Sequence, residues 1–152
     1  MAVDEQMRTL YRDRIRLHDQ EQPGYAARWT LWRNRLVQLG GVEVVPPLSP
    51  EFDLDNLLLS AVLHDRPVIT VAGEPRNCHG NSAALFVADQ TPNGDPVASI
   101  GTGYARNGAL WRQHSWALGP DGTIYETTTP RDAYVGLVLD DQAAYRFVVA
   151  NT

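Results

Sequence analysis

Four extended segments in the second half of the chain are separated by short turns, and this spacing restricts the fold more than any other feature. The segments are rich in β-branched and aromatic residues. Asn107-Gly108 separates the first two and Gly119-Pro120-Asp121-Gly122 the next two, and both turns use residue types that close β-hairpins. Consecutive hairpins form an antiparallel meander. We therefore expect strands at Val97–Ala105, Leu110–Leu118, Thr123–Thr128 and Tyr134–Leu139.

The first half of the chain has helical periodicity instead. Apolar residues recur at three- and four-residue steps from Asp4 to about His18, and again from Tyr25 to Leu39, where Trp29 and Trp32 are expected in the core. Gly40-Gly41 ends the second helix. A third helix begins after Asp53 or Asp55 and carries apolar residues nearly all round, which predicts burial. Short extended pieces are expected at Val42–Val45 and Pro67–Val71.

These segments predict an α+β fold in a single domain over residues 1–152. A chain of 152 residues suits one domain with one core. Residues 1–73 form the helical half, and residues 74–152 form a cysteine-bearing helix packed on the antiparallel sheet. Tyr145–Ala150 fits a last strand or a terminal helix equally well.

Charge and composition exclude several classes of function. The formal net charge is −5, which disfavours general binding to nucleic acid or to an anionic membrane. No segment approaches the roughly 20 apolar residues of a membrane span, and the first residues lack the pattern of a signal peptide. The single cysteine fits a reducing compartment. We expect a cytoplasmic protein, unless an export route delivers it without a signal peptide.

That single cysteine, Cys78, is the first candidate for chemistry. It follows a break at Gly73-Glu74-Pro75 and precedes Ser82–Ala88, which reads as a helix burying Ala84, Leu85 and Val87. A thiol in the first turn of a helix lies near unpaired backbone N–H groups and the positive end of the helix dipole. Both favour the thiolate, which is the nucleophilic form. The alternative is that Cys78 is a small buried hydrophobic residue.

Two strands supply partners for a cysteine nucleophile. His114 and Trp116 lie on one face of the second predicted strand, and Ser115 lies on the other. We expect the first face to meet the cysteine helix. Glu126 lies on the returning strand, within about one register step of His114. A carboxylate beside an imidazole fixes its tautomer and stabilises its charged form.

These motifs resemble the core of papain-like and transglutaminase-like cysteine enzymes. The resemblance covers about residues 74–139 and rests on Cys78 at a helix start, His114-Ser115-Trp116, and Asp121 to Thr128. It implies that Cys78 attacks an amide or ester carbonyl, that His114 transfers the proton and that Glu126 orients His114. The implied activity is acyl transfer of the hydrolase, deamidase or transglutaminase type, on a peptide, protein or small amide, without a cofactor. This chain has Glu where the family usually has Asp or Asn.

Other residues near the cysteine have narrower expected roles. The backbone N–H of Cys78 is the natural first donor to an oxyanion, and Asn77, Asn81 and Gln113 are candidates for the second. Trp116 is expected in the floor or wall of the cleft. His79 points about 100° away from Cys78 on a helix, so we expect it at the surface or in a wall. The paired ligand spacing of structural zinc is missing, and no metal is implied.

A second interpretation comes from a different class of protein. A papain-like scaffold without activity can serve as a binding or immunity module, with Cys78 merely buried. The two interpretations differ in the reactivity of the thiol, because a sealed cysteine does not react faster than a free thiol.

Overall fold

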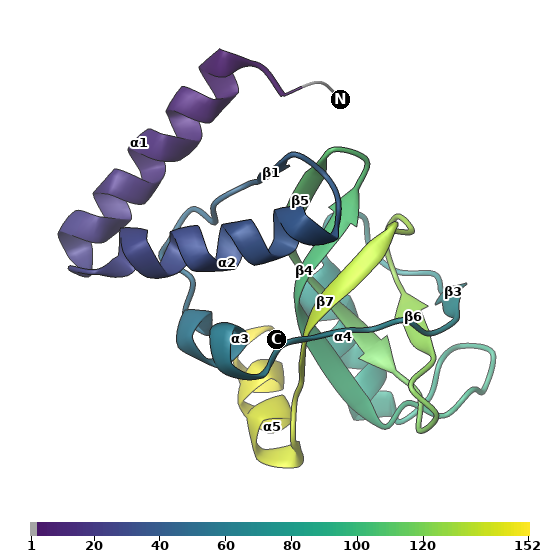
Figure 1. The fold of residues 1–152 in the computed structure, drawn as a ribbon. Helices are drawn as coiled ribbons and strands as arrows, with labels where there is room; N and C mark the ends of the chain where they lie inside the picture. The colour runs from purple at the N-terminus through teal and green to yellow at the C-terminus, as the bar shows by residue number, and fades with distance from the viewer. Residues whose placement is uncertain (1–2) are drawn as a thin grey trace.

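Two N-terminal helices follow the apolar periodicity of the sequence. The computed structural model describes residues 3–152, in which α1 spans Glu5–Glu21 and α2 spans Tyr25–Leu39. Met1 and Ala2, at the start of the predicted domain, lie outside the described residues. The Asp4 carboxylate begins α1 by accepting a hydrogen bond of 2.8 Å from the backbone N–H of Met7. Figure 1 shows α1 at one side of the molecule, in contact with α2.

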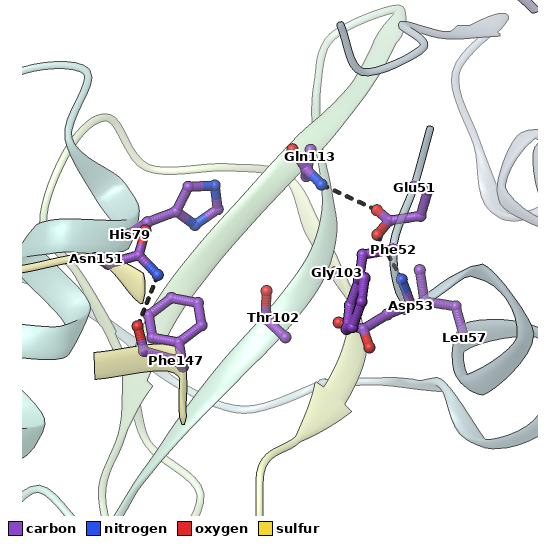
Figure 2. Close-up of a pocket in the computed structure, with 10 residues that line it drawn as sticks. All are labelled: Glu51, Phe52, Asp53, Leu57, His79, Thr102, Gly103, Gln113, Phe147 and Asn151. Atoms are coloured by element: carbon purple, nitrogen blue, oxygen red, sulfur yellow. Dashed lines mark hydrogen bonds between the residues drawn. The ribbon is translucent and has the colours of Figure 1, made fainter. Parts of the chain in front are cut away.

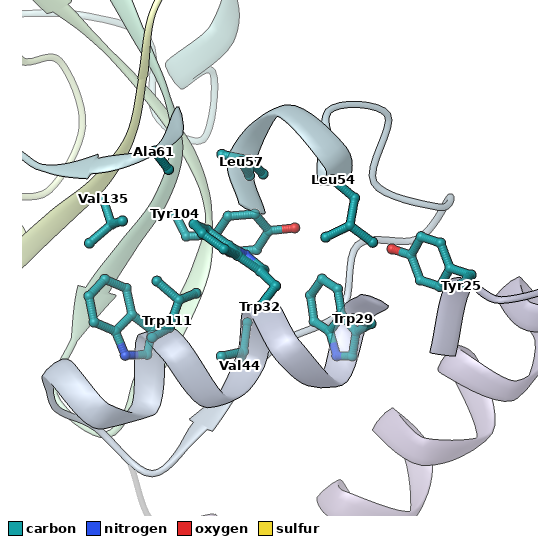
Figure 3. Packing of buried hydrophobic residues seen from close by; sticks show 11 residues of the cluster. Tyr25, Trp29, Trp32, Val44, Leu54, Leu57, Ala61, Tyr104, Trp111 and Val135 are labelled. Carbon is teal, nitrogen blue, oxygen red and sulfur yellow. The ribbon is translucent and has the colours of Figure 1, made fainter. Parts of the chain in front are cut away.

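The buried face of α2 joins the helical half of the chain to the sheet. Trp29 and Trp32 pack edge-on against Tyr104 of the sheet, with ring centroids 6.0 and 5.6 Å apart. Because these rings come from both halves of the sequence, the two halves share this hydrophobic cluster. Figure 3 shows the cluster, which consists of Tyr25, Trp29, Trp32, Leu36, Val44, Leu54, Leu57, Ala61, Tyr104, Trp111 and Val135.

The segment between α2 and the cysteine contains the two short extended pieces that the sequence predicts and one strand, β2, that it does not. Its elements are β1 at Glu43–Val44, α3 at Leu54–Ser60, β2 at Val62–Leu63 and β3 at Val68–Thr70. The predicted third helix is therefore too long, and its prediction as buried all round is wrong, since Leu59 is 84% exposed. The helix ends because Val62 and Leu63 pair with β7, a partner from a distant part of the chain.

The second half of the chain supplies the central strands. These are β4 at Ser99–Asn107, β5 at Leu110–Leu118, β6 at Ile124–Glu126 and β7 at Ala133–Val138. The first three form consecutive antiparallel pairs, as predicted. β7 instead pairs with β4, on the edge that β5 does not use. The predicted meander is therefore correct up to β6 and wrong for the last strand.

The sheet is mixed, which corrects the prediction of a purely antiparallel one. Its strand order is β2-β7-β4-β5-β6-β3, with β1 on the free part of β5. β1 runs parallel to β5, and β3 runs parallel to β6. These short strands come from residues 1–73, so that half is not purely helical. They pair with backbone N–H and C=O groups that would otherwise be unpaired at the edges of the meander.

Two further helices complete the α+β fold. α4 spans Cys78–Ala88 and α5 spans Asp141–Ala150, so the last segment is a helix. α4 buries Leu85 against Ala117 and Tyr125, whereas Val87, which the sequence predicts to be buried, is 64% exposed. Ala84, also predicted to be buried, is exposed, and Ala83 is buried in its place. None of the helices in residues 3–152 has the length and apolar character that crossing a membrane requires.

The sheet is curled, as a hydrogen bond between distant strands shows. β6 and β7 are separated by β4 and β5, so a flat sheet would hold them roughly 14 Å apart at about 4.8 Å per strand. The Tyr134 hydroxyl on β7 nevertheless donates to the Glu126 carboxylate on β6 at 2.7 Å. We call the face that bears these two side chains the inner face. His114 and Trp116 of β5 lie on it as well.

The opposite face, which we call the outer face, carries Tyr104, Ser115 and Ala117. α2 packs on this face through Tyr104, and α4 packs on it through Ala117. The prediction that Ser115 and Ala117 point away from the cysteine helix is therefore wrong. The physical reason is that the curl buries the inner face by itself, which leaves the outer face for the helices.

Glycines make the tight curl possible. Gly101, Gly103 and Gly136 all lie on the inner face, on neighbouring strands β4 and β7. A Cβ atom at Gly103 would overlap the carbonyl oxygen of Val135, and one at Gly101 would overlap the Trp116 indole. Because these positions carry no side chains, the backbones of β4 and β7 can approach each other more closely than larger residues would allow.

We therefore expect Gly103→Ala to lower the free energy of unfolding by about 2 kcal/mol or more, because the added methyl group meets backbone rather than a movable side chain. Urea denaturation followed by circular dichroism measures this. Asn107→Ala, at the exposed end of the same strand, is the control and should change the free energy by less than about 0.5 kcal/mol. A Gly103→Ala protein as stable as wild type would contradict the tight curl.

Candidate active site

Cys78 is the first residue of α4, at the end of a loop that is closed by side-chain contacts. The Asn81 carboxamide accepts a hydrogen bond from the Glu74 N–H at 3.1 Å and donates one to the Glu74 carbonyl at 2.8 Å. Arg76 adopts a left-handed φ of +59°, which turns the chain into the helix. Cys78 is left half-buried, with its N–H among the unpaired donors of the first turn.

His114 lies in a stretch of β5 that has a strand partner on one edge only. It pairs with Gly103 of β4. The other edge pairs with β1 at Leu110–Trp111 and with β6 at Ala117–Leu118, and among the described residues no strand pairs there with residues 112–116. β5 and β6 therefore separate next to His114, where its ring meets Glu126.

Glu126 is a fully buried carboxylate with four hydrogen bonds. Its Oε1 accepts from His114 Nε2 and from the Tyr134 hydroxyl, each at 2.7 Å. Its Oε2 accepts from the backbone N–H and the hydroxyl of Thr128, at 3.0 and 2.9 Å. Because Glu126 engages Nε2, Nδ1 is the nitrogen of His114 that remains for Cys78.

The electrostatics of this pair favour the charged forms of both residues. Burial by itself would raise the pKa of Glu126, but hydrogen bonding and charge from His114, with donors from Tyr134 and Thr128, lower that pKa to about 2. Burial by itself would lower the pKa of His114, but hydrogen bonds to Cys78 and Glu126 and their negative charges raise it. His114 is therefore disposed to hold a second proton.

Cys78 is the third ionisable residue of the site, and the pKa of its thiol is strongly lowered. Burial alone would raise the pKa of Cys78, but hydrogen bonding from His114 and then His79, with the positive charge of both rings, lowers it to about 5. The structure thus brings together the three residues predicted to act in catalysis, Cys78, His114 and Glu126. They can form a thiolate, an imidazolium and a carboxylate at neutral pH.

His79 is the functional candidate that the sequence reasoning missed. Its Nδ1 hydrogen-bonds to the Ser115 hydroxyl at 2.6 Å, and that hydroxyl lies 2.9 Å from the hydroxyl of Thr102. Hydrogen bonding and charge from the His79 ring also help to lower the pKa of Cys78. Strand alternation already predicts that Ser115 and His114 lie on opposite faces of β5. It could have indicated a contact between His79 and Ser115 only if α4 had been known to cover the face that bears Ser115.

Of the candidates for the second oxyanion donor, Asn77 lies nearest in sequence to Cys78, and its side chain makes the fewest hydrogen bonds. It is the N-cap residue of α4, and its carboxamide makes no hydrogen bond within residues 3–152. The side chain lies over Gly80, where an added Cβ would come within 2.7 Å of it. A carboxamide with free N–H groups beside the Cys78 N–H can donate to a developing oxyanion.

The other predicted contact residues have different surroundings. Asn81 is committed to Glu74, and the Gln113 amide donates to Glu51 at 3.0 Å. Trp116 is fully buried on the inner face, beside the rings of His114 and Tyr134. It cannot touch a substrate in this structure, which corrects its predicted place in the cleft surface. It packs behind His114 because the curl turns that face inward.

Comparisons with known proteins leave the site as the sole guide to function. No protein family, curated protein or solved structure matches the chain. Within residues 3–152, no group of three or more His, Cys, Asp or Glu side chains is placed to hold a metal ion. The chemistry available from the arrangement is nucleophilic attack by sulfur, with one proton carried by His114.

We expect the absorbance of the thiolate at 240 nm to titrate with a midpoint near pH 5 in wild type, measured against Cys78→Ser. His114→Ala should move the midpoint upward toward the free-cysteine value of about 8.5, because it removes the largest acidifying contact. His79→Ala should move it upward by less. A wild-type midpoint at or above about 8.5 would refute an activated thiol.

A second prediction concerns stability and pH. The folded-state pKa of Glu126, about 2, lies below its ordinary value of 4.5, so the ionised carboxylate stabilises the fold above pH 4.5. That stabilisation disappears as the pH falls through 4.5 towards 2. At pH 7, Glu126→Gln should therefore be less stable than wild type by an amount on the order of 3 kcal/mol.

Urea denaturation between pH 7 and pH 3 measures this difference, which should shrink steadily below pH 4.5. Glu21→Gln, at an exposed position of α1, is the matched control and should show no such trend. A difference between Glu126→Gln and wild type that stays constant with pH would contradict the assigned ionisation.

Proposed function

We propose that the protein is a cysteine-dependent acyl-transfer enzyme that acts on an amide or ester. The observation that carries the proposal is the pairing of an acidified thiol, with a pKa of about 5, and a buried histidine held by a carboxylate at 2.7 Å. Such a pairing is costly to bury unless the charges compensate one another. Cys78, His114 and Glu126 are the residues to which we assign the chemistry.

In the first step, the Cys78 thiolate attacks the carbonyl carbon, a C–S bond forms and the carbonyl π electrons move to oxygen. The backbone N–H of Cys78 and the carboxamide of Asn77 donate to that oxyanion. As the tetrahedral intermediate collapses, the His114 imidazolium gives its proton to the leaving nitrogen or oxygen. The products are a thioester on Cys78, a neutral His114 and the free amine or alcohol.

In the second step, neutral His114 takes a proton from an incoming water or amine as that nucleophile attacks the thioester. The C–S bond breaks, Cys78 leaves as a thiolate and His114 remains as imidazolium, which restores the starting state. Water as the nucleophile gives hydrolysis or deamidation, and an amine gives transamidation. Glu126 keeps the Nε2 side of the ring fixed in both steps, so it acts as a positioning residue.

The likeness to papain-like and transglutaminase-like enzymes supports this assignment at the level of residue order. The cysteine begins a helix, the histidine follows on a strand and the carboxylate on the next strand, within an α+β fold. We infer a papain-like or transglutaminase-like core on these grounds. We also place the enzyme in the cytoplasm, because a half-buried catalytic thiolate that substrates can reach keeps its activity in a reducing compartment.

Acylation by p-nitrophenyl acetate tests the proposal. Intact mass spectrometry should find one acetyl group on wild type and none on Cys78→Ala. His114→Ala should slow p-nitrophenol release by a factor on the order of 10²–10⁴. Glu126→Gln should slow it by less, because this residue orients the ring and does not carry the proton.

The control is His18→Ala, which changes a histidine that bonds to the Pro47 carbonyl in the helical half and should not alter the rate. Circular dichroism establishes that each variant is folded. If wild type and His114→Ala acetylate at the same rate, the acyl-transfer assignment is wrong. The inactive binding or immunity module then becomes the better interpretation.

A further inference from the structure

A pocket lies on the outer face of the sheet, one residue away from the nucleophile (Figure 2). It has a volume of about 190 Å³, below the ~300–1,000 Å³ of pockets for drug-sized ligands, which suits a single side chain or small group. Its lining residues come from the segment around α3, from α4, β4, β5 and α5: Glu51, Phe52, Asp53, Leu57, His79, Thr102, Gly103, Gln113, Phe147 and Asn151.

His79 connects this pocket to the chemistry. Its ring lines the pocket and packs edge-on against Phe147, with centroids 5.8 Å apart. The same ring acidifies the adjacent Cys78 thiol. A group bound in the pocket therefore lies one side chain away from the reacting sulfur.

The polar groups of the pocket are mostly acceptors. Glu51 and Asp53 bring two carboxylates, and no Lys or Arg is among the described residues that line the pocket. The amides of Gln113 and Asn151 each donate one hydrogen bond, to Glu51 and to the Phe147 carbonyl, and each keeps its amide oxygen as an acceptor for a ligand. Such a set of acceptors matches a ligand that brings several N–H donors.

Glu51 gives independent support because it is a buried carboxylate without a cation. Its side chain accepts hydrogen bonds from the Tyr104 hydroxyl, the Gln113 amide and the backbone N–H of Asp53. The residue is 7% exposed, and within residues 3–152 no ion pair includes Glu51 or Asp53. Buried carboxylates are rare unless a positive charge compensates them. A cationic ligand would supply that charge.

The apolar walls fit the rest of such a ligand. Phe52, Leu57 and Phe147 line the pocket around the acceptors. Methylene groups of a lysine- or arginine-like stem pack on apolar surface while the charged head meets the carboxylates. Phe52 is almost fully exposed, at 96%, and its free ring face can also attract a cation.

We propose that this pocket is a substrate subsite that binds an alkylammonium or guanidinium group next to Cys78. The inference deepens the proposed acyl-transfer function and rests on it. The cationic group belongs either to the side chain of the acyl donor, as in a lysine or arginine peptide, or to a free amine that accepts the acyl group. The chemistry that the pocket recognises is the same in both cases.

Binding to the folded Cys78→Ser protein tests the pocket without any turnover. Isothermal titration calorimetry or ligand-observed NMR compares Nα-acetyl-lysine N-methylamide with its uncharged norleucine analogue. We expect the lysine compound to bind about tenfold more tightly or better, since a charge-assisted hydrogen bond is roughly twice as strong as a neutral one. Equal affinities, or no binding of either compound, would overturn the cationic subsite.

Two matched substitutions on neighbouring residues locate the effect. In the Cys78→Ser background, Asp53→Asn removes one charge from the pocket and should weaken lysine binding about threefold to tenfold. Asp55→Asn makes the same change at an exposed position outside the pocket, where the residue pairs with Arg28 at 2.7 Å, and should leave binding unchanged. Equal effects of the two variants would mean that the protein attracts cations generally and that the pocket is not the site.

Kinetics on wild type then separates the two sources of the cation. If the acyl donor provides it, the p-nitrophenyl ester of Nα-acetyl-lysine should acylate Cys78 faster than the norleucine ester. If a free amine provides it, the acetyl-enzyme should react with n-butylamine to give N-butylacetamide. Here the bound butylammonium first gives one proton to a carboxylate of the pocket. The neutral amine nitrogen then bonds to the carbonyl carbon, the C–S bond breaks, Cys78 leaves as a thiolate and the second amine proton passes to His114.

Lysine binding to Cys78→Ser together with an unreactive wild-type Cys78 would overturn acyl transfer while leaving the cation pocket in place. A reactive Cys78 in a protein that does not bind the lysine compound would overturn the pocket alone.

Discussion

The Glu126 carboxylate is the interaction on which the arrangement of the second half of the chain depends. It lies inside the curled sheet and accepts hydrogen bonds from His114 on β5, from Tyr134 on β7 and from Thr128 just beyond β6. These contacts join strands that a flat sheet would keep far apart. Because an ionised carboxylate without such donors could not remain buried, the curl of the sheet and the charge of Glu126 depend on each other.

The same curl positions the Cys78 thiol. It buries the inner face without help from the helices, so α4 packs on the outer face through Leu85 and Ala117. Among residues 3–152, no strand pairs with one edge of β5 around His114, and there the first residue of α4 meets the ring that Glu126 holds. The low pKa of Cys78 thus follows from the contact with His114 at the separation between β5 and β6, together with the contribution of His79.

The incorrect predictions share one physical origin. A local sequence pattern does not specify the distant segment with which a strand or helix will pack. Val62 and Leu63 look like the end of an apolar helix but pair with β7. Trp116 alternates with Ser115 as expected, yet the alternation does not reveal which face the helix will cover. His79 does lie in a wall, as expected, but its contact with Ser115 could not be foreseen, since it exists only when α4 lies on the outer face.

The sequence by itself determined the first two helices, the β4–β5–β6 meander and the expectation that Cys78, His114 and Glu126 lie close together, because helix periodicity, turn residues and strand alternation are local properties. The tertiary structure decided the mixed pairing of the sheet, its curl, the face that receives α4 and the pocket around Glu51. Each of these depends on contacts between segments far apart in the chain. Burial and hydrogen bonding between such segments also set the charges of the site, which no local pattern specifies.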